Sequence, residues 1–353
     1  MASSFPSRSF ALSDERILLT PEALRAWGEQ EELSDFRVAQ VLRWVFRGGI
    51  TDFAEMTNVG KVLRRSMAQR FRLDALPPPQ AVTANDATTR LVFRLPSGGA
   101  VETVVIPERQ RLTVCVSSQV GCGMGCDFCA TAKLGLRRSL SGIEIAAQLV
   151  AVRRLLGPDE RISNVVFMGM GEPLHNYAAV LEAIEIMRAN WGFALSARRI
   201  TVSTVGLLPQ LQRLTRETDV AVAISLTAAR DALRDRLMPV NRRYPLRAIA
   251  ETCRELPISQ RRRITFEYVL LRGVNDGDSD ASDLVGLLGG IRAKVNLIPF
   301  NPFPGARYQA PTPQGVRDFQ QRLLARGLST TVRKTRGGDV QAACGQLAAA
   351  AVG

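Results

Sequence analysis

Short apolar runs alternate with longer amphipathic runs from about residue 111 towards the C-terminus. The short runs predict strands near 112–116, 162–168, 199–203, 219–226, 263–270 and 294–298. In the longer runs apolar positions recur every three or four residues, which predicts helices near 141–156, 177–189, 205–214, 245–255, 279–289 and 313–326. Six such units without hairpin signals predict a parallel sheet with helices outside it, either a partial barrel or a doubly wound sheet. Both architectures place ligands at the carboxyl ends of the strands.

The residues before this repeat predict helices and a hairpin. Thr20, Ser34 and Thr57 each precede a run with helical spacing and can cap a helix there. Three prolines at 77–79 predict a linker, and two β-rich runs around a Gly-containing turn predict a hairpin over 90–106. The chain is therefore expected to contain a helical domain at 1–75, a linker and hairpin at 76–110, and an α/β core at 111–347.

The charge of the chain favours a polyanionic partner. Lys and Arg number 46 against 33 Asp and Glu, which gives a net charge of +13 and a pI near 10.3. Nucleic acid is the first candidate, although a general solubility bias would give the same excess. Basic residues of the N-terminal helices lie mostly between the apolar positions, which fits either a solvated face or an RNA-binding face. These residues are Arg37, Arg43, Arg47, Lys61, Arg64, Arg65 and Arg70.

Composition excludes several classes of protein. With 353 residues, 46% of them apolar, the chain can bury a core and is not disordered. No apolar run is long enough to span a membrane, and the first 13 residues lack the apolar core of a secretory signal. Six cysteines are too few for a disulfide scaffold. We therefore expect a cytoplasmic protein without a membrane segment.

The cysteines are unevenly placed. Four lie within 15 residues, and Cys122, Cys126 and Cys129 have the spacing Cys-x3-Cys-x2-Cys on a loop with several glycines. An iron–sulfur cluster held by three cysteines leaves one iron open for a cofactor. A structural zinc needs a fourth ligand, which Cys115 or the single histidine, His175, could supply. A zinc site and inert buried cysteines therefore stand as alternatives.

This loop resembles that of the radical S-adenosylmethionine superfamily. Longer strings narrow the resemblance to the RlmN/Cfr family of RNA adenine methyltransferases. The matching strings lie at 36–40 with Trp44, and at 115–122, 169–173, 299–305, 332–337 and 343–347. The match covers most of the chain, and the pairing of Cys115 with Cys344 is more specific than the cysteine loop alone.

The resemblance implies a fold, cofactors and a mechanism. The fold would be a partial (β/α)6 barrel with an N-terminal RNA-binding helical domain. One [4Fe–4S] cluster on the three loop cysteines would bind S-adenosylmethionine, two molecules of which are used per turnover. Cys344 would be methylated first, and a radical would then carry its methylene carbon to an adenine. Glu102 would accept the ring proton, and Cys115 would release the product through a transient disulfide. Taken singly, Glu102 could be a solvated strand residue, and each cysteine an inert buried thiol.

The resemblance also implies which residues bind S-adenosylmethionine. They follow the strands of the predicted sheet: Gly171, Glu172, Ser203, Ser225, Leu226, Thr227 and Asn301. Taken singly, each could be an ordinary polar turn residue. Thr227 stands where the family usually has His, so a side-chain role of that His is lost. His175 stands where the family usually has an apolar residue, and Cys253 matches no motif and is expected in the core.

Three functions remain open from the sequence. The first is methylation of C2 of an adenosine in 23S rRNA, with tRNA as a second candidate substrate. The second is the Cfr-type methylation of C8, which confers antibiotic resistance. The third is a metal-containing RNA-binding module without activity, which would need no resolving thiol. The Gly-Glu-Pro form of the 171–173 motif favours methylation of C2.

We expect a monomer that takes electrons from an external donor such as a flavodoxin or ferredoxin.

Overall fold

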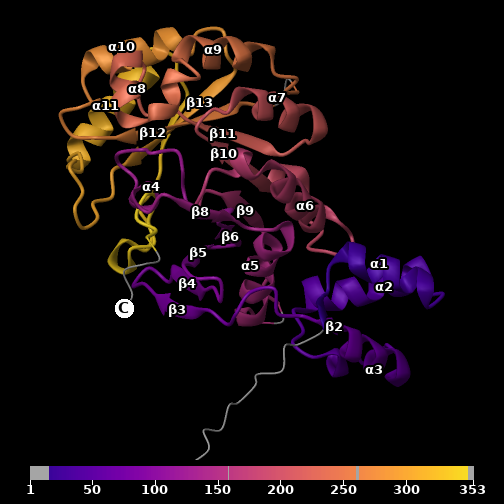
Figure 1. Cartoon of the computed structure of the whole chain (residues 1–353). Coiled ribbons are helices and arrows are strands. Elements are labelled where there is room, and N and C mark those ends of the chain that lie inside the picture. Colours follow the sequence, from indigo (N-terminus) through magenta and orange to yellow (C-terminus); the bar gives the residue numbers. More distant parts are fainter. Residues whose placement is uncertain (1–15, 158, 260–261, 349–353) are drawn as a thin grey trace, which may run out of the picture.

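One ten-stranded sheet runs through the molecule, with helices packed outside it (Figure 1). The computed structural model describes residues 16–157, 159–259 and 262–348, so the expectation about the first 13 residues lies outside the described chain. The strands follow one another in the order β14-β13-β12-β11-β10-β9-β6-β5-β4-β3. Among the described residues, no helix is long and apolar enough to cross a bilayer.

The larger part of the sheet is parallel. Its strands are β6 (Arg111–Cys115), β9 (Asn164–Phe167), β10 (Ile200–Thr204), β11 (Ala221–Ser225), β12 (Ile264–Leu270), β13 (Ala293–Pro299) and β14 (Thr330–Val332). The first six confirm the predicted strands. The last, β14, has no counterpart in the prediction because three residues are too few to show a periodic pattern.

Helices connect these parallel strands. The six predicted helices are confirmed as α5 (Gly142–Leu155), α6 (Tyr177–Arg188), α7 (Leu208–Glu217), α9 (Leu246–Glu255), α10 (Asp278–Leu287) and α11 (Pro313–Ala325). An additional short helix, α8 (Asp231–Leu237), follows β11. Within the described chain the outer strands β14 and β3 do not pair with each other, so the sheet stays open. This is the predicted partial barrel.

The predicted hairpin is part of the same sheet. It consists of β4 (Thr89–Arg94) and β5 (Ala100–Glu108), and the short exposed strand β3 (Gln80–Thr83) adds to its outer side. A second antiparallel pairing joins β5 to β6, where Val104 lies opposite Cys115. Because most of β5 is buried, it continues the core rather than standing apart from it.

The N-terminal residues form a small helical unit. It contains α1 (Pro21–Gln30), α2 (Asp35–Arg43), a π-helical turn at Trp44–Gly48 and α3 (Lys61–Arg70), and two short strands, β1 (Ile17–Leu18) and β2 (Phe71–Arg72), pair beside them. Thr20 and Ser34 cap α1 and α2 as predicted. The prediction for Thr57 is wrong, because the chain turns at 57–59 and α3 begins after Gly60.

The helical unit shares its apolar core with two helices of the parallel part. Ile143, Ala146 and Val150 of α5 and Ile186 of α6 belong to the same buried cluster as the residues of α1 and α2. Hydrogen bonds reinforce this contact. The Arg154 guanidinium on α5 donates to the carbonyl oxygens of Gly49 and Ile50, both at 2.8 Å.

We predict that Arg154→Ala weakens this contact. Loss of two hydrogen bonds from a charged donor should lower the free energy of unfolding by about 1–2 kcal/mol, because the two carbonyl groups lose their partner. Thermal unfolding of the full chain, combined with limited proteolysis of the segment at 17–73, measures the effect. Arg188→Ala, an exposed position on α6, is the control. Equal unfolding temperatures for the two variants would show that these hydrogen bonds are unimportant.

Candidate active site

A cavity lies at the carboxyl ends of the parallel strands. The three loop cysteines lie on its wall, and the side chains that follow β9, β10, β11 and β13 complete the wall. Most of the residues expected to bind S-adenosylmethionine line it, namely Gly171, Glu172, Ser203, Ser225, Thr227 and Asn301. Leu226 does not, since its side chain is buried in the core and only its backbone runs beside the cavity. The structure thus brings together residues from four separate strand ends.

The cysteine loop connects two short antiparallel strands, β7 (Gln119–Gly121) and β8 (Leu136–Ser139), and ends in the short helix α4 (Ala130–Lys133). Gly121 has φ +75°, and a Cβ atom there would lie 1.8 Å from the carbonyl oxygen of Gly135. Only glycine permits this approach. The Cys122 amide donates to the same carbonyl oxygen at 3.0 Å. The loop therefore closes immediately before its first cysteine.

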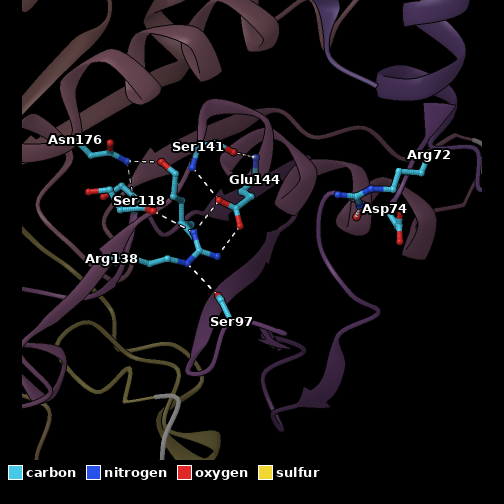
Figure 2. A network of polar contacts seen from close by, with 10 residues as sticks. Arg72, Asp74, Ser97, Ser118, Arg138, Ser141, Glu144 and Asn176 are labelled. Carbon is cyan, nitrogen blue, oxygen red and sulfur yellow. Dashed lines mark hydrogen bonds and ion pairs between the residues drawn. The ribbon is translucent and has the colours of Figure 1, made fainter. Parts of the chain in front are cut away.

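A polar network holds this pair of strands against α5 (Figure 2). The Arg138 guanidinium on β8 donates to both carboxylate oxygens of Glu144, at 2.7 and 2.9 Å, and also to the Ser97 hydroxyl at 3.2 Å. Asn176 donates to the carbonyl oxygens of Ser118 and Leu140. Two-pronged arginine–carboxylate contacts restrict orientation as well as distance. The network thus orients the cysteine loop relative to the strand ends.

The three loop thiols fit an iron–sulfur cluster better than a zinc ion. Burial raises the pKa of Cys122 to about 12 and raises that of Cys126 as well, and the neighbouring thiols add to both shifts. Metal binding would deprotonate them. A zinc ion needs its ligands around one point, and in the described residues no three His, Cys, Asp or Glu side chains are placed in that way. A four-iron cube instead binds each cysteine at a separate corner. The ring of His175, the proposed zinc ligand, is exposed and contacts Gln119.

Glu172 is oriented by backbone amides. Its carboxylate accepts hydrogen bonds from the amides of Leu174 at 3.0 Å and Val205 at 2.9 Å. Burial raises its pKa to about 7, and those amide hydrogen bonds oppose the shift. The preceding Gly171 has φ +102°, and a Cβ atom there would lie 2.6 Å from the Gln119 side chain. Glu172 therefore presents a buried carboxylate, with lone pairs left for the ammonium group of a ligand.

Thr227 has an unused polar atom at the cavity. Its hydroxyl is buried and has no hydrogen-bond partner in the described chain, while its carbonyl oxygen accepts from Asn275 at 2.7 Å. Its backbone has φ +60°, a conformation that is costly for a β-branched residue. A buried hydroxyl without a partner is destabilising unless a ligand supplies one. This observation fits a polar cofactor such as S-adenosylmethionine in the cavity.

Two charged residues that sequence reasoning missed hold the strand ends. Glu267 lines the cavity, accepts from the Ser203 hydroxyl at 3.0 Å and lies 3.6 Å from the Arg333 guanidinium. Arg234 is fully buried and donates to the carbonyl oxygens of Val205 at 2.8 Å and Ser225 at 3.1 Å. Burial lowers its pKa to about 10. A charge within an otherwise apolar run was the available sequence signal for Glu267, whereas Arg234 lies among other charged residues and had no such signal.

The segment after β14 carries Cys344 across the open side of the sheet. The segment first contacts the β3–β4 turn, where the Gly337 amide donates to Asp86 at 3.2 Å. It then reaches the cysteine loop, where the Ala130 amide donates to the Gly345 carbonyl oxygen at 2.8 Å. The Asn301 side chain donates to the Cys344 carbonyl oxygen at 3.1 Å. Cys344 is thereby held at the cavity by residues distant in sequence.

Cys115 lies in the interior of the sheet, and Cys344 affects the pKa of its thiol. Both thiols are free, and Cys115 is 5% exposed at the end of β6. Its pKa is raised to about 12, first by burial and second by Cys344. The Arg333 guanidinium lies near both thiols and opposes these shifts. Cys253 lies in the core on α9, as expected.

Glu102 is buried on β5 and is not a solvated strand residue. It is 0% exposed, and a carboxylate oxygen lies 3.6 Å from the Arg90 guanidinium. It lies two positions from Val104, which is opposite Cys115, so alternation along the strand places Glu102 and Cys115 on the same face of the sheet. Glu102 is not on the wall of the cavity that holds the cysteine loop.

Comparisons with known proteins agree with this geometry. Residues 116–285 match the model of the Radical SAM superfamily, and residues 17–73 match that of the ribosomal RNA large subunit methyltransferase N-terminal domain. The chain is 48% identical over 326 residues to the dual-specificity RNA methyltransferase RlmN of Syntrophobacter fumaroxidans, which covers 92% of this chain and 95% of the relative. The protein of the same name from Geobacter sulfurreducens is 46% identical, over 88% of this chain and 86% of that one.

A solved structure is also similar to this chain over nearly its whole length. The crystal structure of a radical SAM methyltransferase from Sphaerobacter thermophilus matches with a TM-score of 0.89 and 43% sequence identity, covering 95% of this chain and 99% of that one. The similarity to this methyltransferase therefore extends over both the helical unit and the parallel sheet. The chain belongs to the RlmN family of radical S-adenosylmethionine RNA methyltransferases.

Proposed function

We propose that this protein methylates C2 of an adenosine in 23S rRNA, and also an adenosine in tRNA, through a methyl group carried on Cys344. The observation that carries the proposal is Cys344 on the wall of the cavity of the three-cysteine loop, with a second thiol, Cys115, buried at the end of β6 near enough for Cys344 to raise its pKa. A protein that only binds RNA needs neither thiol. The relatives named dual-specificity RNA methyltransferase RlmN support an RNA substrate and favour C2 over the C8 alternative.

The three loop cysteines would hold one [4Fe–4S] cluster, and the polar residues around the cavity would hold S-adenosylmethionine. Bound there, the cluster and S-adenosylmethionine supply the one-electron chemistry that an unreactive ring carbon requires. Glu172 would accept from the ammonium group of S-adenosylmethionine, and the Thr227 hydroxyl would contact its polar atoms. Two molecules per turnover follow from the proposal, one for methylating Cys344 and one for activating that methyl group.

The remaining steps use the side chains of this chain. The Cys344 sulfur carries the one-carbon unit and becomes linked through it to the base. Glu102 takes the ring proton, and Arg90 at 3.6 Å stabilises the carboxylate form that can accept it. The Cys115 thiolate then attacks the Cys344 sulfur, so that an S–S bond forms and the S–CH2 bond breaks. The base leaves with the electron pair of the broken bond on its methylene carbon, which takes up a proton to become a methyl group. Burial of the Cys115 thiol, at the end of β6, keeps competing thiols and water away from it.

The proposal also covers RNA binding, the oligomeric state, the electron donor and the cellular location. The N-terminal helical unit at 1–75 would contribute to RNA binding, since its residues 17–73 match the N-terminal domain of rRNA methyltransferases. A monomer is part of the same proposal. An external one-electron donor such as a flavodoxin or ferredoxin would reduce the cluster. An RNA substrate and six free thiols support a cytoplasmic location.

We predict that replacing Cys122, Cys126 or Cys129 by Ala removes the iron and the brown colour of protein prepared without oxygen. Each change removes one of only three cysteine ligands, so RNA methylation should also be lost. Iron and sulfide analysis with absorption spectroscopy measures the cluster. Cys253→Ala, a buried cysteine in the core, is the matched control and should keep both. Stoichiometric zinc without iron or sulfide in the unchanged protein would contradict the cluster assignment.

We predict that Cys115→Ala traps a covalent protein–RNA adduct. The link between Cys344 and the base can form, but no thiol remains to break it. Denaturing gel electrophoresis after ribonuclease digestion should show protein that carries nucleotide. Cys344→Ala should give neither adduct nor methylated RNA, and Cys253→Ala should behave as the unchanged protein. Normal turnover by Cys115→Ala would rule out the resolving role.

A further inference from the structure

Two cavities meet at Cys344. The first is the cavity of the cysteine loop. The second lies between the β5–β6 strands and the segment that follows β14, and it shares Ile298, Asn301 and Cys344 with the first. Cys344 can therefore be reached from two sides, and the first side is the one where S-adenosylmethionine would bind. The second cavity is therefore the space next to Cys344 that is open to an acceptor.

The second cavity leads to a basic groove on the surface. The groove is formed by the β5–β6 turn and the segment after β14. Its walls are Glu108, Arg109, Gln110, Arg111, Lys334 and Arg336, and three of these, Glu108, Lys334 and Arg336, also line the second cavity. Four residues of the groove are basic and one is acidic, so it attracts anions. The shared walls make the groove and the cavity continuous.

The basic residues of the groove differ in whether they already form ion pairs within the protein. Arg336 lies 3.7 Å from Asp86 and 3.9 Å from Glu108, so its charge is already balanced within the protein. Arg109, Arg111 and Lys334 are exposed, and the described part of the chain shows no ion pair for any of them. These three side chains are available to an external polyanion.

The inner walls of the second cavity have a different character. Ile106, Ile298, Val332 and Ala342 contribute apolar surface, and Thr113, Asn301, Arg333 and Thr335 add polar groups. Basic side chains at the mouth and a mixed apolar and polar interior match a nucleotide whose base has left its stack while its neighbouring phosphates stay outside. An acidic peptide would match the mouth but would not need a pocket ending at a methyl-carrying sulfur.

We propose that Arg109, Arg111 and Lys334 bind the RNA phosphates that flank the target nucleotide, and that its base reaches Cys344 through the second cavity. The proposal rests on the RNA methylation proposed above and names the surface that delivers the substrate. This surface is separate from the N-terminal helices, because α1–α3 and the C-terminal segment lie on opposite sides of the molecule in Figure 1. Binding at the two surfaces can therefore be measured separately.

The test is the double variant Arg111→Ala/Lys334→Ala in the cluster-containing full chain. Its KM for an rRNA fragment should rise roughly tenfold, and the slope of log affinity against log salt should become shallower by about 1.4, as for two lost contacts to single-stranded phosphates. Methylation of Cys344 by S-adenosylmethionine without RNA, read by peptide mass spectrometry, should be unchanged. The control is Arg188→Ala/Arg216→Ala, which removes the same charge from the outer helices α6 and α7.

The outcomes separate this inference from the proposed function. A KM and a salt slope equal to those of the control variant would overturn the groove assignment while RNA methylation by the unchanged protein continued. Loss of Cys344 methylation in the groove variant would also overturn it, because the residues would then serve the first cavity. The charge-conserving Arg111→Lys/Lys334→Arg variant should keep the original salt slope, and a slope as shallow as that of the alanine variant would contradict phosphate binding. Absence of RNA methylation by the unchanged protein would instead refute the proposed function.

Discussion

The active site depends on one segment that crosses the gap left by an open sheet. A partial barrel leaves its outer strands unpaired, and here the segment after β14 spans that gap. Hydrogen bonds from Asn301 and Ala130 hold the backbone around Cys344. Since Ala130 directly follows Cys129, one hydrogen bond links the position of Cys344 to that of the cysteine loop. The distance between the two proposed reaction centres is therefore set by backbone contacts.

Two buried charged residues at the strand ends, Glu267 and Arg234, are matched by partners on other strands. Glu267 accepts from Ser203 and lies beside Arg333, while Arg234 donates to carbonyl groups at the ends of β10 and β11. An unmatched charge in such surroundings would be strongly destabilising. Because these partners belong to different strands, the charges also align the strand ends that form the cavity. Stability and the geometry of the site are thus produced by the same contacts.

The features that could be predicted from the sequence are those with a local pattern of residues. Apolar periodicity revealed six strands and six helices, and cysteine spacing with the family resemblance revealed the residues around the first cavity. Contacts between distant segments had no such signal. β14 is too short to show a period, and the expected cap at Thr57 is replaced by a turn that Met56 and Val59 form through their backbones. The crossing of the C-terminal segment, and with it the cavity shared at Cys344, follows only from the folded chain.

The central claim is that the methyl carbon passes through Cys344 before it reaches C2 of adenosine. S-adenosylmethionine with a trideuterated methyl group, an rRNA fragment and an electron donor test it directly, with mass spectrometry of the released nucleosides. We expect 2-methyladenosine with two deuterium atoms in its methyl group, because the carbon that bridges sulfur and base is a methylene. A methyl group with all three deuterium atoms would contradict passage through that bridge, and 8-methyladenosine would contradict the assignment to C2.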